Sequence, residues 1–206
     1  MSSNGSSKSK TPIILAVVGG IVVLLLVAAV FSGGEQLGGS EFGEPVLEGS
    51  ALPPMPSDVR QDTSATGLAA PSISGVDFAD NPVVFENDGR AKGIVFLAHW
   101  CGNCQEEVPR VQAWLDAGGG VEGVDLYSVA TSINSGRPNY PPSEWLDREG
   151  WTVPVIRDDQ AGSAHKAFGA GGFPYWVFTN SDGTVAVRAA GQLSTPELVS
   201  IPESLN

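Results

Sequence analysis

The sequence has few cysteines, histidines and methionines, and these shortages exclude several kinds of site. Among its 206 residues there are two of each. A small secreted domain held by disulfides needs more cysteines, spread along the chain. A structural zinc site normally takes four Cys or His ligands. The two cysteines are therefore part of some other arrangement, or at most half of a metal site.

Basic residues are also scarce. The chain has 11 Lys and Arg against 23 Asp and Glu, a formal net charge of −12. This balance disfavours binding to nucleic acid, which requires basic patches, and docking on anionic lipid. The acidic residues are scattered and form no calcium-loop pattern. We interpret them as a solvated surface that keeps the protein soluble.

The sequence does contain one long apolar run. Residues 13–31 carry no charge, and as a helix these 19 residues would span roughly the ~30 Å hydrocarbon core of a bilayer. Residues 1–12 are polar and include Lys8 and Lys10. The positive-inside rule then places residues 1–12 in the cytoplasm and everything after residue 31 outside the membrane. A cleaved signal peptide is the alternative, but its apolar region is usually only ~7–15 residues long.

The rest of the chain divides into two parts. Residues 32–70 are rich in Gly, Ser, Pro and Glu without an apolar face, and this composition predicts a flexible linker. Residues 71–206 alternate apolar runs with helical patterns, in the order β–α–β–α–β–β–α. This order predicts an α/β domain in which a mixed central sheet is flanked by helices.

The two cysteines, Cys101 and Cys104, lie in the stretch "AHWCGNCQEEVP" at 98–109. A disulfide between them would close almost no loop, so it would stabilise little. His99 lies too close in sequence to share a tetrahedral ion easily. The spacing favours a redox dithiol over a structural disulfide or a metal site.

The position of the dithiol assigns each thiol a role. An apolar strand at 93–100 precedes Cys101, and a helical pattern follows at 102–117. In that pattern the residues Cys104, Val108, Val111 and Leu115 recur at intervals of 4, 3 and 4, which predicts one buried stripe. Amides and the dipole at a helix start stabilise a thiolate, so Cys101 is predicted to be the exposed, attacking thiol. Cys104 lies one turn further on the same face and could resolve a mixed disulfide formed on Cys101.

These features resemble the thioredoxin family over roughly residues 75–203. "WCGNC" after an apolar strand is similar to the family's active site, and Pro109 matches its helix proline. The resemblance places Pro174 as the cis-proline that faces the dithiol and binds substrate backbone. Trp100 is expected to shield one side of the dithiol. Phe173 stands where the family often has Thr or Val, and its ring is expected to narrow substrate choice.

A second pattern is similar to the membrane-tethered TlpA/ResA-like branch. Cytosolic thioredoxins have an acid where this chain has Val95, whereas the tethered branch has C-x-x-C-x-x-E-x-P. Glu107 fills the glutamate position and could exchange a proton with Cys104. The alternative is a helix carboxylate with no role in exchange, like Glu106.

The resemblance implies a single-pass protein of the bacterial plasma membrane that exchanges thiols and disulfides outside the cytoplasm. It would take electrons from a membrane thiol carrier, without a bound cofactor or metal, and reduce protein disulfides, cytochrome c maturation being one such task. Asn103 between the cysteines leaves the redox direction open, so a disulfide-forming oxidant is an alternative. A copper-handling protein would have C-x-x-x-C, and a peroxidase a threonine and proline before one attacking cysteine.

Four further side chains carry expectations. His99 is expected to be an exposed neighbour of the dithiol, with an effect on the thiolate as the alternative. His165 is expected to be a surface residue of a short helix. Trp176 and Phe178 are expected to belong to the core of the closing hairpin.

Overall fold

The structure is a computed structural model, and it describes Met1 and residues 40–206. The predicted anchor at 13–31, most of the cytoplasmic segment 1–12 and residues 32–39 of the linker lie outside the described residues. None of the helices in the described part is long and apolar enough to cross a membrane.

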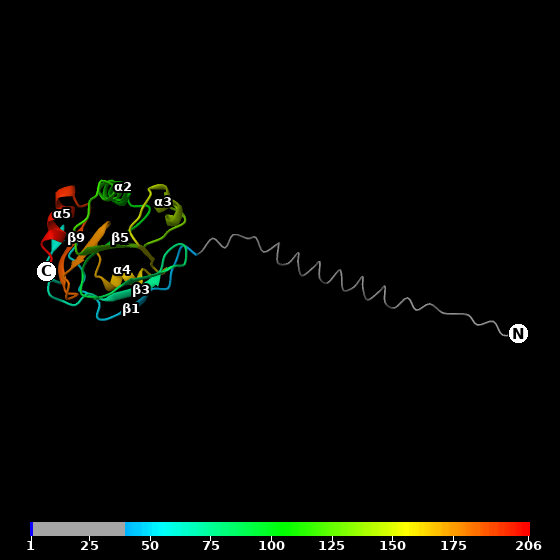
Figure 1. Cartoon of the computed structure of the whole chain (residues 1–206), viewed down its shortest axis with the longest axis horizontal. Coiled ribbons are helices and arrows are strands. Elements are labelled where there is room, and N and C mark those ends of the chain that lie inside the picture. Colours follow the sequence, from blue (N-terminus) through cyan, green and yellow to red (C-terminus); the bar gives the residue numbers. More distant parts are fainter. Residues whose placement is uncertain (2–39) are drawn as a thin grey trace. The chain divides into compact units, whose positions relative to one another are not determined.

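A six-stranded mixed sheet forms the centre of the domain (Figure 1). Its central strand, β5 (Ala91–Leu97), runs parallel to β6 (Val124–Ala130) and antiparallel to β8 (Tyr175–Thr179). The order across the sheet is β2-β9-β8-β5-β6-β7. The outer strands are β2 (Gln61–Asp62), β7 (Val155–Arg157) and β9 (Val185–Ala190).

Helices cover both faces of this sheet, as the sequence predicts. Figure 1 shows α2 (Gly102–Asp116), α3 (Pro142–Arg148) and α5 (Thr195–Glu203) on one side and α4 (Ser163–Ala167) on the other. A small antiparallel sheet lies on the α4 side, in the order β1 (Val46–Glu48), β3 (Ser72–Val76), β4 (Pro82–Phe85). Ser194 forms a capping box with Glu197 at the start of α5.

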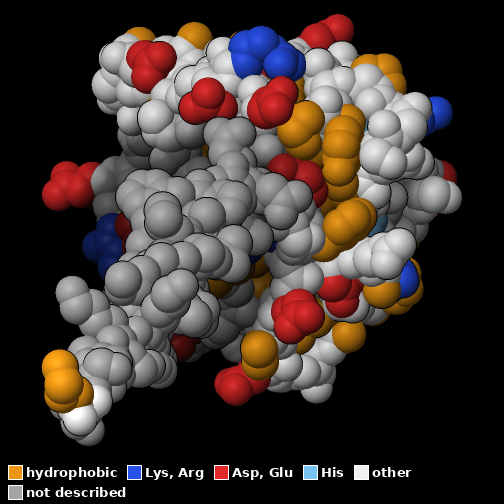
Figure 2. Space-filling view, turned by 90° about the vertical axis from the view of Figure 1, so that its right-hand side faces the viewer, with side chains coloured by type: hydrophobic (Ala, Val, Ile, Leu, Met, Phe, Trp, Pro, Cys, Tyr) orange, Lys and Arg blue, Asp and Glu red, His pale blue; other side chains and the backbone are white. Residues whose placement is uncertain are grey.

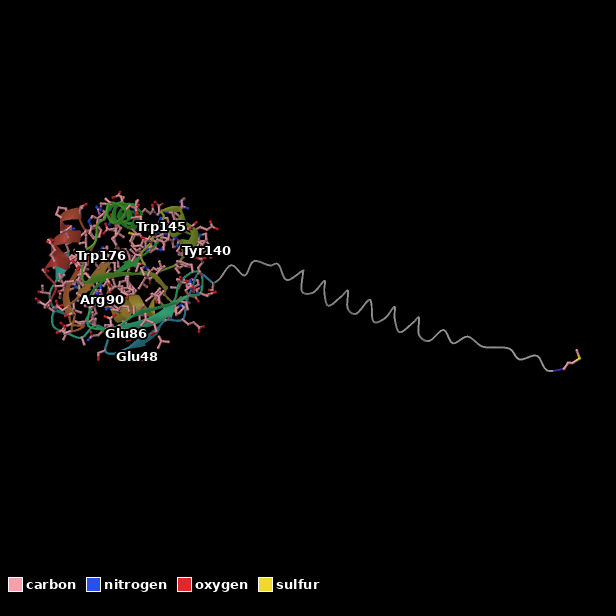
Figure 3. The ribbon with its side chains drawn as sticks, viewed as in Figure 1. Glu48, Glu86, Arg90, Tyr140, Trp145 and Trp176 are labelled. Atoms are coloured by element: carbon pink, nitrogen blue, oxygen red, sulfur yellow. The ribbon has the colours of Figure 1, made fainter. Side chains whose placement is uncertain are left out.

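Strand β5 contributes side chains to two separate cores, because successive side chains of a strand point to opposite faces. All seven of its residues are buried. Ile94 and Phe96 pack on the α4 side, whereas Val95 and Leu97 pack on the side of α2 and α3. The second core also contains Trp145 and Trp176 (Figure 3). The predicted core positions of Trp176 and Phe178 are confirmed, since both are almost fully buried.

The predicted flexible linker is wrong for residues 40–70. This segment forms β1 and β2 and buries Leu52, Met55 and Ala65 in the α4-side core. Buried Arg188 donates to the Pro53 carbonyl (2.6 Å) and forms an ion pair with Asp62. The segment lacks a periodic apolar pattern because it uses isolated apolar residues and two very short strands.

Acidic side chains are distributed over the visible surface rather than gathered in one cluster (Figure 2). This arrangement agrees with the solvated acidic surface that the sequence predicts.

The ion pair between Asp62 and Arg188 gives a direct test of this packing. We predict that Asp62→Asn lowers the free energy of unfolding by about 3 kcal/mol, because it leaves a buried guanidinium without its counter-charge. Urea unfolding of the full-length protein measures this loss. Asp58→Asn, at an exposed position nearby, is the control and should change stability little. Equal midpoints for the two variants would contradict the packing described for residues 40–70.

Candidate active site

The dithiol lies where β5 ends and α2 begins. Cys101 is the N-cap residue of α2, with extended backbone angles (φ −80°, ψ 122°). Its N–H donates to the Ala98 carbonyl (2.9 Å), which fixes the turn out of the strand. Cys101 is partly exposed and Cys104 is buried, and the two thiols are not bridged. The predicted order of exposure is therefore confirmed.

Cys104 lies on the buried face of α2. It is 0% exposed and packs in the same core as Val108 and Val111, so the helical stripe predicted from the sequence is present. Burial raises the pKa of Cys104 far above its ordinary value, and a backbone hydrogen bond from Ala98 offsets only part of this effect. Cys104 is therefore a neutral thiol near pH 7, and it must lose a proton before it can attack.

The loop before β8 faces Cys101. The peptide bond between Phe173 and Pro174 is cis. The Cys101 thiol donates to the Phe173 carbonyl, with 3.7 Å between sulfur and oxygen. The next carbonyl along the chain, that of Pro174, accepts from the Gly191 N–H (2.8 Å). The structure thus brings Phe173 and Pro174 to the dithiol.

Trp100 and Phe173 form an aromatic edge beside Cys101. Their rings meet edge to face, with centroids 5.9 Å apart. The indole N–H of Trp100 donates to the Ser132 carbonyl (2.7 Å), and the Arg137 guanidinium lies 4.9 Å from the indole centroid. Sequence reasoning missed Ser132 and Arg137, because nothing in the pattern of residues 131–141 shows that this loop folds back onto Trp100.

His99 is buried, and the expectation that it is exposed is wrong. Its side chain is 1% exposed and joins β5 to the loop after β6. The ring lies 2.7 Å from the Pro138 carbonyl through Nδ1 and accepts from the Asn134 N–H through Nε2 (3.1 Å). These partners require a proton on Nδ1 and none on Nε2. Burial lowers the pKa of His99, which is consistent with a neutral ring.

His165 also differs from its expected place on the surface. It is partly buried, and its ring stacks on Phe173 with centroids 4.6 Å apart and an interplanar angle of 22°. No motif in the sequence indicates this stack, because it depends on how the loop between α4 and β8 folds.

Glu107 is 0% exposed and links α2 to two other elements. Its Oε1 accepts from the Trp176 indole N–H (3.0 Å) on β8 and from the Leu193 N–H (3.1 Å) before α5. Its Oε2 pairs with Arg110. The carboxylate therefore has a structural role in addition to any part in proton exchange. Val95, at the family's acid position, is buried and apolar.

Within residues 40–206, no group of three or more His, Cys, Asp or Glu side chains is arranged to hold a metal ion. The groups that meet at the site include the two thiols and the Phe173 carbonyl, which faces Cys101.

No family model and no curated protein matches the chain. A thiol:disulfide interchange protein of the thioredoxin family from Chlorobium tepidum is 25% identical, with a TM-score of 0.54, over 69% of this chain and 97% of that one. The structural neighbours are thiol–disulfide oxidoreductases of thioredoxin fold.

Two further structures show the same fold at lower identity. A DsbF homologue from Corynebacterium diphtheriae has a TM-score of 0.60 and 15% identity, over 76% of this chain and all of that one (100%). A secreted disulfide oxidoreductase from Mycobacterium tuberculosis has a TM-score of 0.52 and 19% identity, over 64% of this chain and 95% of that one. The domain therefore has a thioredoxin-like fold, as the sequence predicts.

The structural role of Glu107 can be separated from a role in proton exchange. We predict that Glu107→Gln lowers the free energy of unfolding by about 2 kcal/mol, because the new amide N–H groups face the Arg110 guanidinium and leave donors unpaired. Glu106→Gln, at the exposed neighbouring position, is the control and should stay within about 0.5 kcal/mol of wild type. Urea unfolding measures both, and equal stabilities would contradict the structural role. If Glu107 also transfers a proton, Glu107→Gln slows thiol–disulfide exchange above neutral pH, whereas Glu106→Gln does not.

Proposed function

We propose that this chain is a thiol–disulfide oxidoreductase whose attacking group is Cys101. One observation carries the proposal. A partly exposed thiol at a helix start faces the carbonyl before a cis-proline, with a second thiol buried one turn behind it. The 25% identical structural neighbour, described as a thiol:disulfide interchange protein, supports the same activity.

The reaction follows from the positions of the two thiols. The Cys101 thiolate attacks a client disulfide, the client S–S bond breaks, and one client thiolate leaves as the mixed disulfide forms. Cys104 then loses its proton and attacks the Cys101 sulfur, and the second client thiolate leaves. Two electrons pass to the client, and the dithiol becomes the Cys101–Cys104 disulfide.

The step at Cys104 needs a proton acceptor, since burial keeps this thiol protonated. Glu107, three residues further along α2, is our proposed acceptor. Three donors already contact its two oxygens. An ionised carboxylate has about four acceptor positions, so one position remains for the proton.

We further propose that the protein is anchored in the bacterial plasma membrane by residues 13–31, with the thioredoxin-like domain outside. A membrane thiol carrier would return the Cys101–Cys104 disulfide to the dithiol, and the protein would reduce client disulfides. Supporting this are the uncharged run, the two lysines before it and the C-x-x-C-x-x-E-x-P pattern. A secreted relative by fold is known from Mycobacterium tuberculosis. Cytochrome c precursors are the client class that the resemblance favours.

The roles of the two cysteines can be tested by trapping. Cys104→Ser should still attack but cannot resolve, so mixed disulfides with client proteins should accumulate on Cys101. Cys101→Ser should lose disulfide reduction and form no such adducts. Non-reducing electrophoresis of cells that carry each variant detects the adducts. Absence of adducts in Cys104→Ser, together with an equal loss of activity in both variants, would refute the assigned roles.

The reduction potential of the Cys101–Cys104 pair decides whether the protein passes electrons to its clients or takes electrons from them. Thioredoxin-like reductants lie near ~−270 mV and strong disulfide-forming oxidants near ~−120 mV. We expect a value near the lower figure for the full-length protein in detergent, equilibrated with glutathione or dithiothreitol buffers. A value near the upper figure would replace the proposed reductant with an oxidant of exported proteins.

A further inference from the structure

His165 is a partly buried, titratable side chain next to the site that the proposed reaction does not use. It lies on α4, on the opposite face of the sheet from α2. Its ring is nevertheless close to the loop that faces Cys101, because that loop connects α4 to β8.

The ring of His165 is fixed from several sides. It stacks on Phe173 (4.6 Å, 22°) and meets Phe96 and Tyr175 edge to face, with centroid distances of 5.9 Å and 6.5 Å. Phe96 and Tyr175 are both 0% exposed. The His165 ring therefore lies between a rigid aromatic core and the less buried ring of Phe173.

The backbone of His165 is anchored as well. Its N–H donates to Oδ2 of Asp158 (3.2 Å), a fully buried carboxylate. Asp158 also accepts from the Thr131 hydroxyl (2.6 Å) and the Ala164 N–H (2.9 Å). Burial lowers the pKa of His165, with Asp158 acting against this effect and Lys166 adding to it. The ring that stacks on Phe173 is thus neutral near pH 7.

Phe173 connects this stack to the chemistry. Its carbonyl accepts from the Cys101 thiol (3.7 Å), and its ring faces Trp100 (5.9 Å). A client segment bound at Cys101 lies next to this aromatic edge, since Phe173 contacts the thiol. A shift of the Phe173 ring therefore changes the surface that the client meets beside Cys101.

We infer that His165 is a positioning residue for client binding: its stacked ring holds Phe173 against Trp100 and keeps the client-facing edge of the dithiol in place. This inference rests on the proposed oxidoreductase function. By this inference, a residue on the opposite face of the sheet from α2 helps to determine client choice. His165 acts through Phe173 rather than on the reacting sulfurs.

The test compares two substitutions at one position in the full-length protein in detergent. His165→Leu keeps an apolar side chain but loses the flat ring, whereas His165→Phe keeps a ring that can stack. With dithiothreitol as the electron donor, we expect kcat/KM for a protein disulfide, insulin, to fall roughly three- to tenfold in His165→Leu, the factor that one aromatic stacking pair is worth. The loss should be mainly in KM, and His165→Phe should restore most of it. Lys166→Ala, at an exposed position of the same helix, should behave as wild type.

Two further measurements separate positioning from general damage. Reduction of hydroxyethyl disulfide, which is too small to span the aromatic edge, should be the same in all four proteins. In a Phe173→Leu background, His165→Leu should cause no additional loss, because the two residues act as one unit.

The outcomes distinguish the positioning role of His165 from the oxidoreductase function. If wild type reduces both disulfides and His165→Leu matches Lys166→Ala on insulin, the inference about His165 is wrong and the oxidoreductase function stands. Independent losses from His165→Leu and Phe173→Leu, or an equal loss on both disulfides, would also overturn it. If wild type reduces neither disulfide, the proposed function fails and this inference fails with it.

Discussion

The burial of β5 on both faces is the constraint on which the rest of the structure depends. Ile94 and Phe96 anchor one side of the sheet, and Val95 and Leu97 anchor the other. A strand fixed in this way can end at only one place. The chain leaves β5 after Leu97 and enters α2 after Cys101, so the packing of the strand places the Cys101 thiol at the carboxyl end of the central strand. Its contacts with the Ala98 and Phe173 carbonyls then hold it there.

Buried polar side chains then attach the surrounding elements to this frame. Glu107 joins α2 to β8 and to the segment before α5, and His99 holds the loop after β6. Each of these groups would be costly to bury alone, so their partners must be in place when the domain folds. The elements around the dithiol are thereby fixed relative to one another, which a reaction between two closely placed sulfurs requires.

The features that could be predicted from sequence are those with a local signal. The apolar run of β5, the stripe of Cys104, Val108 and Val111, and the thiol spacing each appear within a few residues, and a resemblance placed Pro174 at the site. Contacts made only by the tertiary fold had no such signal. His165 reaches Phe173 across a helix–strand connection, and Asp62 pairs with Arg188, which is 126 positions away. Polar residues in a segment without an apolar period therefore carry no sequence signal that they are packed, and such a segment is predicted to be exposed or flexible.

The unequal burial of the two thiols determines which of them a peroxide oxidises and what product follows. Cys101 is the thiol that a peroxide can reach, and its first oxidation product is a sulfenic acid. Cys104 is screened from the oxidant but lies only three residues further along the chain, in the first turn of α2. It can condense with the sulfenic acid, releasing water and forming the ordinary Cys101–Cys104 disulfide. Oxidation that would otherwise proceed to an irreversible sulfinic acid is thereby stopped at a disulfide, which a thiol reductant can return to the dithiol.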